Sequence, residues 1–157
     1  MSNPAAAIRL PAIEASTYIN ASPEKVFACI STAEGWNAWF TKNSEVNLKP
    51  GGKLWLVWRN WGVNHVDHED GGKILEVEPN RKLSFEWHAD MHTKTTVTFT
   101  LTALGNGTVL KVSDSGYLQE DLGKFAGFLD CAIGWGEAIT LLKFYAEHGV
   151  TYGPVPN

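Results

Sequence analysis

Residues 121–148, DLGKFAGFLDCAIGWGEAITLLKFYAEH, are the stretch that decides the fold of this chain. Apolar residues recur in it at alternating steps of three and four, which places them on one stripe of an α-helix. The stripe consists of Phe125, Phe128, Ala132, Trp135, Ile139, Leu142 and Ala146. Because such a stripe must be buried, the sequence predicts one long C-terminal helix over residues 121–148 that packs on the rest of the protein.

Small residues form a second stripe beside the first. They are Gly123, Gly127, Cys131, Gly134 and Ala138. A glycine inside a helix costs about 1 kcal/mol relative to alanine, so several of them in one helix need a reason. Two interpretations stay open: the small residues let another element approach closely, or they leave space for a ligand beside Trp135.

The residues before this helix are typical of short antiparallel strands preceded by two short helices. The first helix is expected to start at Ser22 as N-cap with Pro23 in its first turn. The clearest alternation is TTVTFTLT at 95–102, apolar on one side and threonine on the other. Helices are expected at 22–31 and 33–40, and strands at 13–20, 53–60, 64–78, 82–88, 94–103 and 108–115. No linker divides them, so we expect one α+β domain over 13–149, with flexible tails at 1–12 and 150–157.

This order resembles the helix-grip fold of the START-like (SRPBCC) superfamily. Local motifs narrow the resemblance to the group named for the ATPase activator of the ninety-kilodalton heat-shock protein, and to the C-terminal domain of that activator. The motifs are ASPEKVF at 21–27, WNAWF at 36–40, KPGGK at 49–53, GKILEVEP at 72–79, LSFEW at 83–87, and the pairs 107–108, 115–116 and 134–135. The resemblance implies a curved antiparallel sheet of about seven strands around the C-terminal helix. This chain has Asp114 where the family commonly has a histidine.

Composition excludes several classes of function. The formal net charge is −4 and no Lys/Arg cluster appears, which argues against a nucleic-acid partner. No apolar stretch approaches the roughly 20 residues needed to cross a bilayer, and residues 1–4 show no secretion signal, so we expect no membrane span and a cytoplasmic location. The two cysteines lack motif spacing and are predicted to be free thiols.

Antiparallel strand order gathers one set of turns at one end of the sheet: 58–68, 87–93 and 114–117. Seven tryptophans are many for 157 residues, and large aromatic side chains form both cores and ligand pockets. We therefore predict an aromatic pocket between the sheet and the C-terminal helix. Its expected lining is Trp39, Phe40, Trp58, Trp87, Phe125, Phe128 and Trp135, with His65, His88 and Asp114 as polar contacts.

Asp114 is the unusual member of this set. The phase of its strand directs it inward, and a carboxylate that faces an apolar interior must be hydrogen-bonded, paired or protonated. In one interpretation Asp114 lies at the strand end, touching water or capping the next loop. In the other it is the polar anchor of the pocket, together with His65 or His88.

Two histidine pairs, His65 with His68 and His88 with His92, raise the question of a metal. Their spacing matches no strong metal motif, so we predict no metal site. No nucleophile elbow, phosphate loop or dinucleotide fingerprint is present either, and we assign no catalytic residue and no cofactor.

The sequence therefore favours a module that binds a small, largely apolar ligand. The resemblance implies two alternatives: an enzyme of the cyclase or dehydratase kind that uses Asp114 with a histidine, and a protein that interacts with the chaperone. The chain has no room for the additional N-terminal domain of the full activator, so ATPase stimulation is not expected. A homodimer through an edge strand or the apolar helix is a further option.

Overall fold

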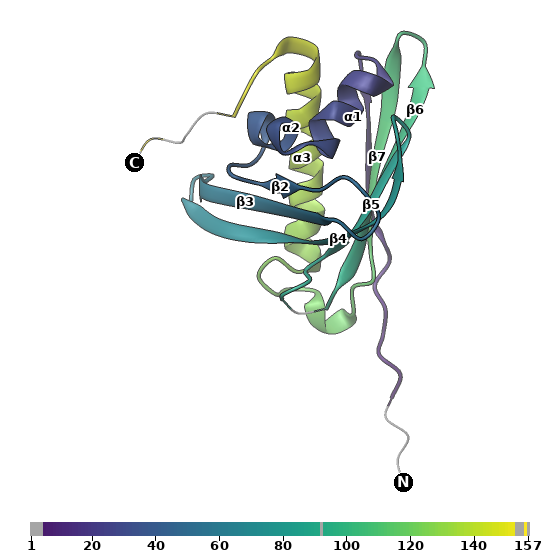
Figure 1. Ribbon diagram of the computed structural model, residues 1–157. Coiled ribbons are helices and arrows are strands. Elements are labelled where there is room, and N and C mark those ends of the chain that lie inside the picture. Colours follow the sequence, from purple (N-terminus) through teal and green to yellow (C-terminus); the bar gives the residue numbers. More distant parts are fainter. Residues whose placement is uncertain (1–4, 92, 153–155, 157) are drawn as a thin grey trace.

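The computed structural model describes residues 5–91, 93–152 and 156. A curved antiparallel sheet wraps around one long helix, which confirms the helix-grip architecture (Figure 1). The strands are β1 (Ile13–Ile19), β2 (Glu45–Val46), β3 (Lys53–Trp61), β4 (Val66–Glu78), β5 (Lys82–Trp87), β6 (Thr95–Leu104) and β7 (Gly107–Ser115). The helices are α1 (Pro23–Ser31), α2 (Ala33–Trp39), the 3₁₀ turn η1 (Gln119–Asp121) and α3 (Phe128–His148).

The seven strands form one sheet in the order β1-β7-β6-β5-β4-β3-β2. Successive hairpins connect β3 to β7, and β1 closes the sheet by pairing with β7. Strand β2 was not predicted individually, because two residues are too short to show a period. It pairs with Trp55 and Leu54 of β3.

The C-terminal helix begins at Phe128, so the predicted start at residue 121 is wrong. Residues 119–127 form η1 and a compact loop instead, in which Asp121 accepts a hydrogen bond from the backbone of Leu118. Gly127 is the N-cap, and a Cβ there would lie 2.3 Å from the carbonyl oxygen of Asp121. Phe125 is therefore outside the helix and its side chain is 63% exposed, although its spacing fits the apolar stripe.

The two short helices lie beside the C-terminal half of α3 (Figure 1), and α1 has the start signal predicted from the sequence. Ser22 caps α1 by accepting a hydrogen bond from Lys25 N, and Pro23 occupies the first turn. The buried indoles of Trp36 and Trp39 donate to backbone carbonyls of α1, which fixes α2 against α1. This arrangement leaves the N-terminal half of α3 to face β3, β4 and β5.

The interior is filled by the side chains that the alternation along each strand directs inward, as expected from the sequence. The predicted inward residues are all buried: Leu54, Leu56, Trp58, Leu83, Phe85, Trp87, Val97, Phe99, Leu101, Leu110, Val112 and Asp114. Trp135 is 4% exposed and faces them from α3.

Strand β4 passes from one partner to another at a pair of glycines. It pairs with β3 through Lys73 and with β5 from Ile74 onward. Gly71 has a φ of 157°, and a Cβ there would lie 2.1 Å from the carbonyl oxygen of Leu54. The absence of a side chain thus lets the two strands approach and brings the β3–β4 hairpin over the N-terminal half of α3.

Ordered contacts extend beyond both ends of the predicted domain, whose boundaries stay a prediction. Arg9 forms a β-bridge with Leu118, and Leu10 N donates to Tyr117 O. At the other end the ring of Tyr152 stacks on Trp61 at 4.3 Å between centroids. Within the described part of the chain, no helix is long and apolar enough to cross a membrane.

Candidate functional site

A cavity of about 410 Å³ lies between the N-terminal half of α3, the loop before it, the β3–β4 hairpin and the end of β5. Small-molecule sites typically measure roughly 300–1,000 Å³, so this space suits a small organic ligand. It is lined by Phe40, Trp58, Trp61, Asn64, Val66, His68, Asp70, Trp87, His88, Phe125, Ala126, Asp130, Cys131, Ile133, Gly134 and Trp135.

The inner walls are aromatic rings that contact one another edge to face. Phe40 meets Trp58 at 5.4 Å and Trp61 at 5.2 Å between centroids, with interplanar angles of 83° and 88°. Trp58 meets Trp87 at 6.2 Å and 86°, and Trp87 lies 5.4 Å from Trp135. Edge-to-face pairs add stability beyond their buried area, so each ring holds the next in place. The aromatic wall of the cavity is therefore held in place by its own ring contacts.

The mouth and one wall of the cavity lie on α3. Phe125 and Ile133 are 63% and 72% exposed, an apolar rim at the entrance. A Cβ added to Gly134 would meet no atom within 4 Å, whereas one at Gly127 would meet backbone at 2.3 Å. Gly127 thus permits close packing and Gly134 leaves open space, and the use of that space by a ligand stays a prediction.

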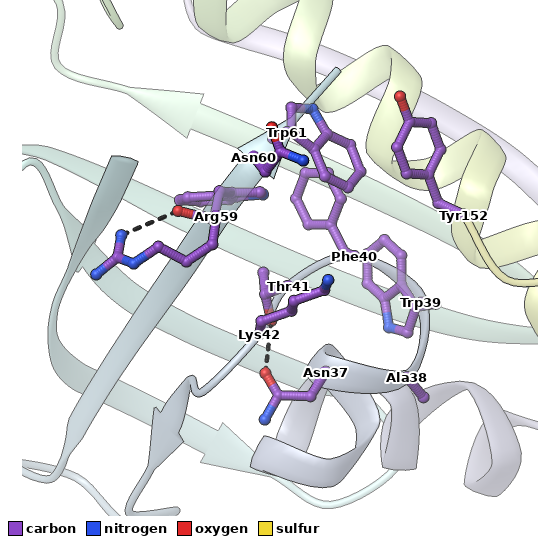
Figure 2. Close-up of a pocket in the computed structure, with 11 residues that line it drawn as sticks. Asn37, Ala38, Trp39, Phe40, Thr41, Lys42, Arg59, Asn60, Trp61 and Tyr152 are labelled. Atoms are coloured by element: carbon purple, nitrogen blue, oxygen red, sulfur yellow. Dashed lines mark hydrogen bonds between the residues drawn. The ribbon is translucent and has the colours of Figure 1, made fainter. Parts of the chain in front are cut away.

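A second hollow of about 70 Å³ lies nearby, and it also includes Phe40, Trp58 and Trp61 in its lining (Figure 2). Its other walls carry Lys42 and Arg59. Its volume is far below the roughly 300–1,000 Å³ of typical small-molecule sites. The larger cavity is the candidate site.

Four buried polar side chains form a hydrogen-bonded chain beneath the cavity. Asp70 Oδ2 lies 2.6 Å from His88 Nδ1, and His88 Nε2 lies 2.9 Å from the Tyr117 hydroxyl. The Tyr117 hydroxyl donates to Asp114 Oδ2 at 2.6 Å. All four are at most 1% exposed. Asp114 also accepts hydrogen bonds from Thr95 and from the indole of Trp135, at 2.7 and 3.0 Å.

The number of protons in this chain determines its charge. Three links need three protons, of which the tyrosine hydroxyl supplies one and a neutral imidazole supplies one. The third must sit on His88 or on one of the two carboxyl groups. Burial raises the pKa of Asp114, opposed by its hydrogen bonds from Tyr117, Thr95 and Trp135. Wherever the third proton resides, the chain carries a net charge of −1.

Cys131 lies between the buried chain and the cavity. Its Sγ is 3.6 Å from His88 Nε2 and donates to Ala126 O at 3.3 Å. Burial raises the pKa of the Cys131 thiol to about 12, so the thiol stays protonated at neutral pH and is a poor nucleophile. Cys29 and Cys131 are both free thiols, as predicted.

His88, Asp114 and Cys131 also bring potential metal-ligand atoms within 4.8 Å of one another. The Tyr117 hydroxyl already bonds to the first two of these groups. The atoms are thus engaged in hydrogen bonds, and the absence of a metal site stays a prediction. His92, a member of one predicted histidine pair, lies outside the described residues.

His68 is a polar side chain of the cavity wall. From the sequence it was considered only as a possible metal ligand. Its ring stacks on Trp58 at 5.7 Å and contacts Phe125 at 5.5 Å. Its Nε2 lies 3.9 Å from Asp70 Oδ2. Burial lowers the pKa of His68 below its usual 6.5, against the opposing effect of Asp70. The His68 imidazole is therefore neutral at pH 7.

This shift predicts a pH dependence of stability. The unfolded chain binds the His68 proton more readily than the folded protein, so the contribution of His68 to stability is complete above about pH 6.5 and decreases as the pH falls. We expect the NMR signal of the His68 ring to titrate with a midpoint below 6.5, and His68→Gln to flatten the acid limb of denaturation curves. A midpoint at or above 6.5 would contradict the assignment.

The structure brings six of the ten predicted ligand-binding residues to the cavity wall. They are Phe40, Trp58, Trp87, His88, Phe125 and Trp135. Trp39 is buried beside the wall, Phe128 packs on Tyr117, and Asp114 lies beneath the floor. His65 is at the hairpin turn with a φ of 51°, and its Nδ1 lies 2.7 Å from Asn60 Oδ1.

Several lining residues were not predicted from the sequence, and one available signal would have identified three of them. Val66, His68 and Asp70 are alternate residues of β4, so they share one face of the sheet. The inward phase was assigned to the neighbouring strands but not to this one. Trp61 was missed because the register shifts between Trp58 and Trp61.

Comparison of the chain with known proteins identifies its family. The family model described as activator of Hsp90 ATPase homolog 1-like protein matches residues 20–147. The chain belongs to this family. The match includes all the cavity-lining residues. The comparison with curated proteins found no match.

Solved structures of several similar proteins have the same fold. The solution structure of the Aha1 dimer from Colwellia psychrerythraea has a TM-score of 0.71 at 20% identity, covering 89% of this chain and 98% of that one. A Bacillus halodurans protein has a TM-score of 0.67 at 29% identity, with 89% and 99% covered. CalU16 from Micromonospora echinospora has a TM-score of 0.68 at 22% identity, with 89% and 81% covered.

Proposed function

We propose that this member of the family binds a small, largely apolar ligand in the cavity between the curved sheet and α3. The supporting observation is a space of about 410 Å³ that is walled by interlocked aromatic rings and open beside Gly134. A protein that used these rings only as core would pack them closely, because interiors are filled to crystal-like density.

Apolar burial supplies the affinity. A bicyclic aromatic ligand that buries about 300 Å² of apolar surface gains about 7 kcal/mol. Part of this gain is offset by the loss of translational and rotational freedom on association. We therefore expect dissociation constants of roughly 10–100 μM for unoptimised aromatic probes.

The direct test is calorimetric titration with 2-acetylnaphthalene, a neutral aromatic ketone. We expect saturable binding of one probe per chain in the stated range. Linear, unsaturable heats up to the solubility limit of the probe would refute a preformed apolar site.

An enzyme of the cyclase or dehydratase kind is the weaker candidate. The predicted acid, Asp114, reaches His88 only through the Tyr117 hydroxyl and does not line the cavity. The polar side chains of the cavity lining include His68, Asp70, His88 and Asp130. His68, whose ring is neutral and lines the wall, could accept a proton from a ligand but has no acidic proton to donate at pH 7.

A protein partner is the remaining candidate, and it rests on the comparisons. The family is named for activators of the Hsp90 ATPase, and the similar Aha1 protein from Colwellia psychrerythraea is a dimer in its solution structure. In this chain the apolar rim includes Leu129, which is 50% exposed, beside Phe125 and Ile133. A chaperone or a second copy would cover this rim, and sedimentation with and without chaperone distinguishes the two.

A further inference from the structure

The groups around the cavity that carry charge are negative. Asp70 and Asp130 are the ionisable acids of the lining, and none of its described residues is a lysine or an arginine. The adjacent small hollow has Lys42 and Arg59 as the charged residues of its described lining (Figure 2), and Arg59 pairs with Glu69 Oε2 at 2.9 Å. The two spaces therefore differ in charge although they share three aromatic residues.

The negative charge does not depend on the position of a single proton. The chain from Asp70 through His88 and Tyr117 to Asp114 has a net charge of −1 with its third proton on the imidazole or on a carboxyl group. Its Asp70 end is part of the wall. His68 is neutral and does not offset this charge.

The N-terminus of α3 would attract an anion through the helix dipole. Its first turn already contains an acid, Asp130, whose Oδ2 accepts a hydrogen bond from Ala126 N. The positive end of the helix dipole thus faces a carboxylate of the protein. A ligand carboxylate in the cavity would approach Asp130 and the Asp70 end of a chain with net negative charge, and no lysine or arginine is among the described lining residues.

We propose that the cavity selects apolar molecules that carry a protonated amine and rejects carboxylates of the same shape. The aromatic body would lie against the wall formed by Trp58, Trp87 and Trp135, and the ammonium would lie at the mouth near the exposed Asp130. There the ammonium keeps much of its water, so the cost of desolvation stays small. Aromatic rings also attract cations through their π-faces. This inference rests on the proposed function and specifies its ligand class.

Three naphthalenes of nearly equal shape test the charge rule: 2-(aminomethyl)naphthalene, 2-acetylnaphthalene and 2-naphthoate, titrated by calorimetry at pH 7 in low salt. We expect the amine to bind at least about tenfold more tightly than the carboxylate, with the ketone between them. The preference should decrease in 0.5 M salt, which screens partly exposed charges.

Charge variants locate the effect. Asp130→Asn should weaken binding of the amine about three- to fivefold and leave binding of the ketone unchanged. Glu137→Gln also removes one negative charge, but on the exposed face of α3 outside the cavity. It is the matched control and should change the binding of neither the amine nor the ketone.

The outcomes separate the charge rule from the proposed function. If the ketone binds but the carboxylate binds as tightly as the amine, the charge rule is wrong and the apolar site stands. If none of the three binds, both are wrong. A loss of amine binding in Glu137→Gln equal to that in Asp130→Asn would show a long-range field effect and overturn the placement of the ammonium.

Discussion

Asp114→Ala is expected to lower the free energy of unfolding by about 3–5 kcal/mol, the largest effect of any substitution considered for this protein. Asp114 is fully buried and accepts hydrogen bonds from Thr95, Tyr117 and Trp135. Alanine would leave three buried donors without their acceptor. Urea denaturation followed by tryptophan fluorescence measures the change.

Two further substitutions divide this effect into parts. Asp114→Asn retains one acceptor oxygen and should cost about half as much. Tyr117→Phe removes a single hydroxyl and leaves the contacts of Asp114 with Thr95 and Trp135, so we expect about 1–2 kcal/mol. Glu137→Ala on the exposed face of α3 is the control, within about 0.5 kcal/mol of the unchanged protein. If Asp114→Ala resembled this control, the buried chain would not exist as described.

Gly134→Leu is expected to abolish binding of 2-acetylnaphthalene, with an affinity loss of at least about 50-fold, while the protein stays folded. A Cβ at this position meets no atom within 4 Å, so a leucine side chain can extend into the cavity. Leucine also has a higher helix propensity than glycine, which favours stability by about 0.8 kcal/mol. Calorimetry and thermal denaturation on the same sample measure the two effects.

Gly136→Leu is the matched control for this substitution. It makes the same change two residues further along α3, where a Cβ also meets no atom within 4 Å, but Gly136 does not line the cavity. Its affinity should stay within about twofold of the unchanged protein. Equal losses of affinity in the two variants, or an unchanged affinity in Gly134→Leu, would place the ligand elsewhere.

The fold could be predicted because the longer strands showed their pattern and the last helix showed a long apolar stripe, whereas β2, with two residues, showed none. The same stripe misplaced the start of α3. Phe125 has the correct spacing for the stripe. The helix nevertheless starts only at Phe128, because its N-cap Gly127 packs against the backbone of Asp121. Tertiary packing decided that boundary, and a periodic pattern does not contain it.

The candidate site could be predicted in its aromatic part and less well in its polar part. Strand phase placed Trp58, Trp87 and Asp114 inward correctly, because alternation alone determines the face. It did not reveal that Tyr117 would link Asp114 to His88, since Tyr117 lies after the end of β7, where alternation no longer applies. The turn conformation of His65 likewise removed it from the wall.

The central claim is that the ligand lies between α3 and the β3–β5 strands, and the indole N–H signals of the seven tryptophans test it most directly. A two-dimensional ¹H–¹⁵N spectrum recorded during titration with 2-(aminomethyl)naphthalene reports on each indole separately. Four indoles line the cavity and three do not: Trp58, Trp61, Trp87 and Trp135 against Trp36, Trp39 and Trp55. We predict saturable shifts for the first four and small or no shifts for the other three. Equal shifts in all seven signals, or shifts confined to the second group, would contradict the account.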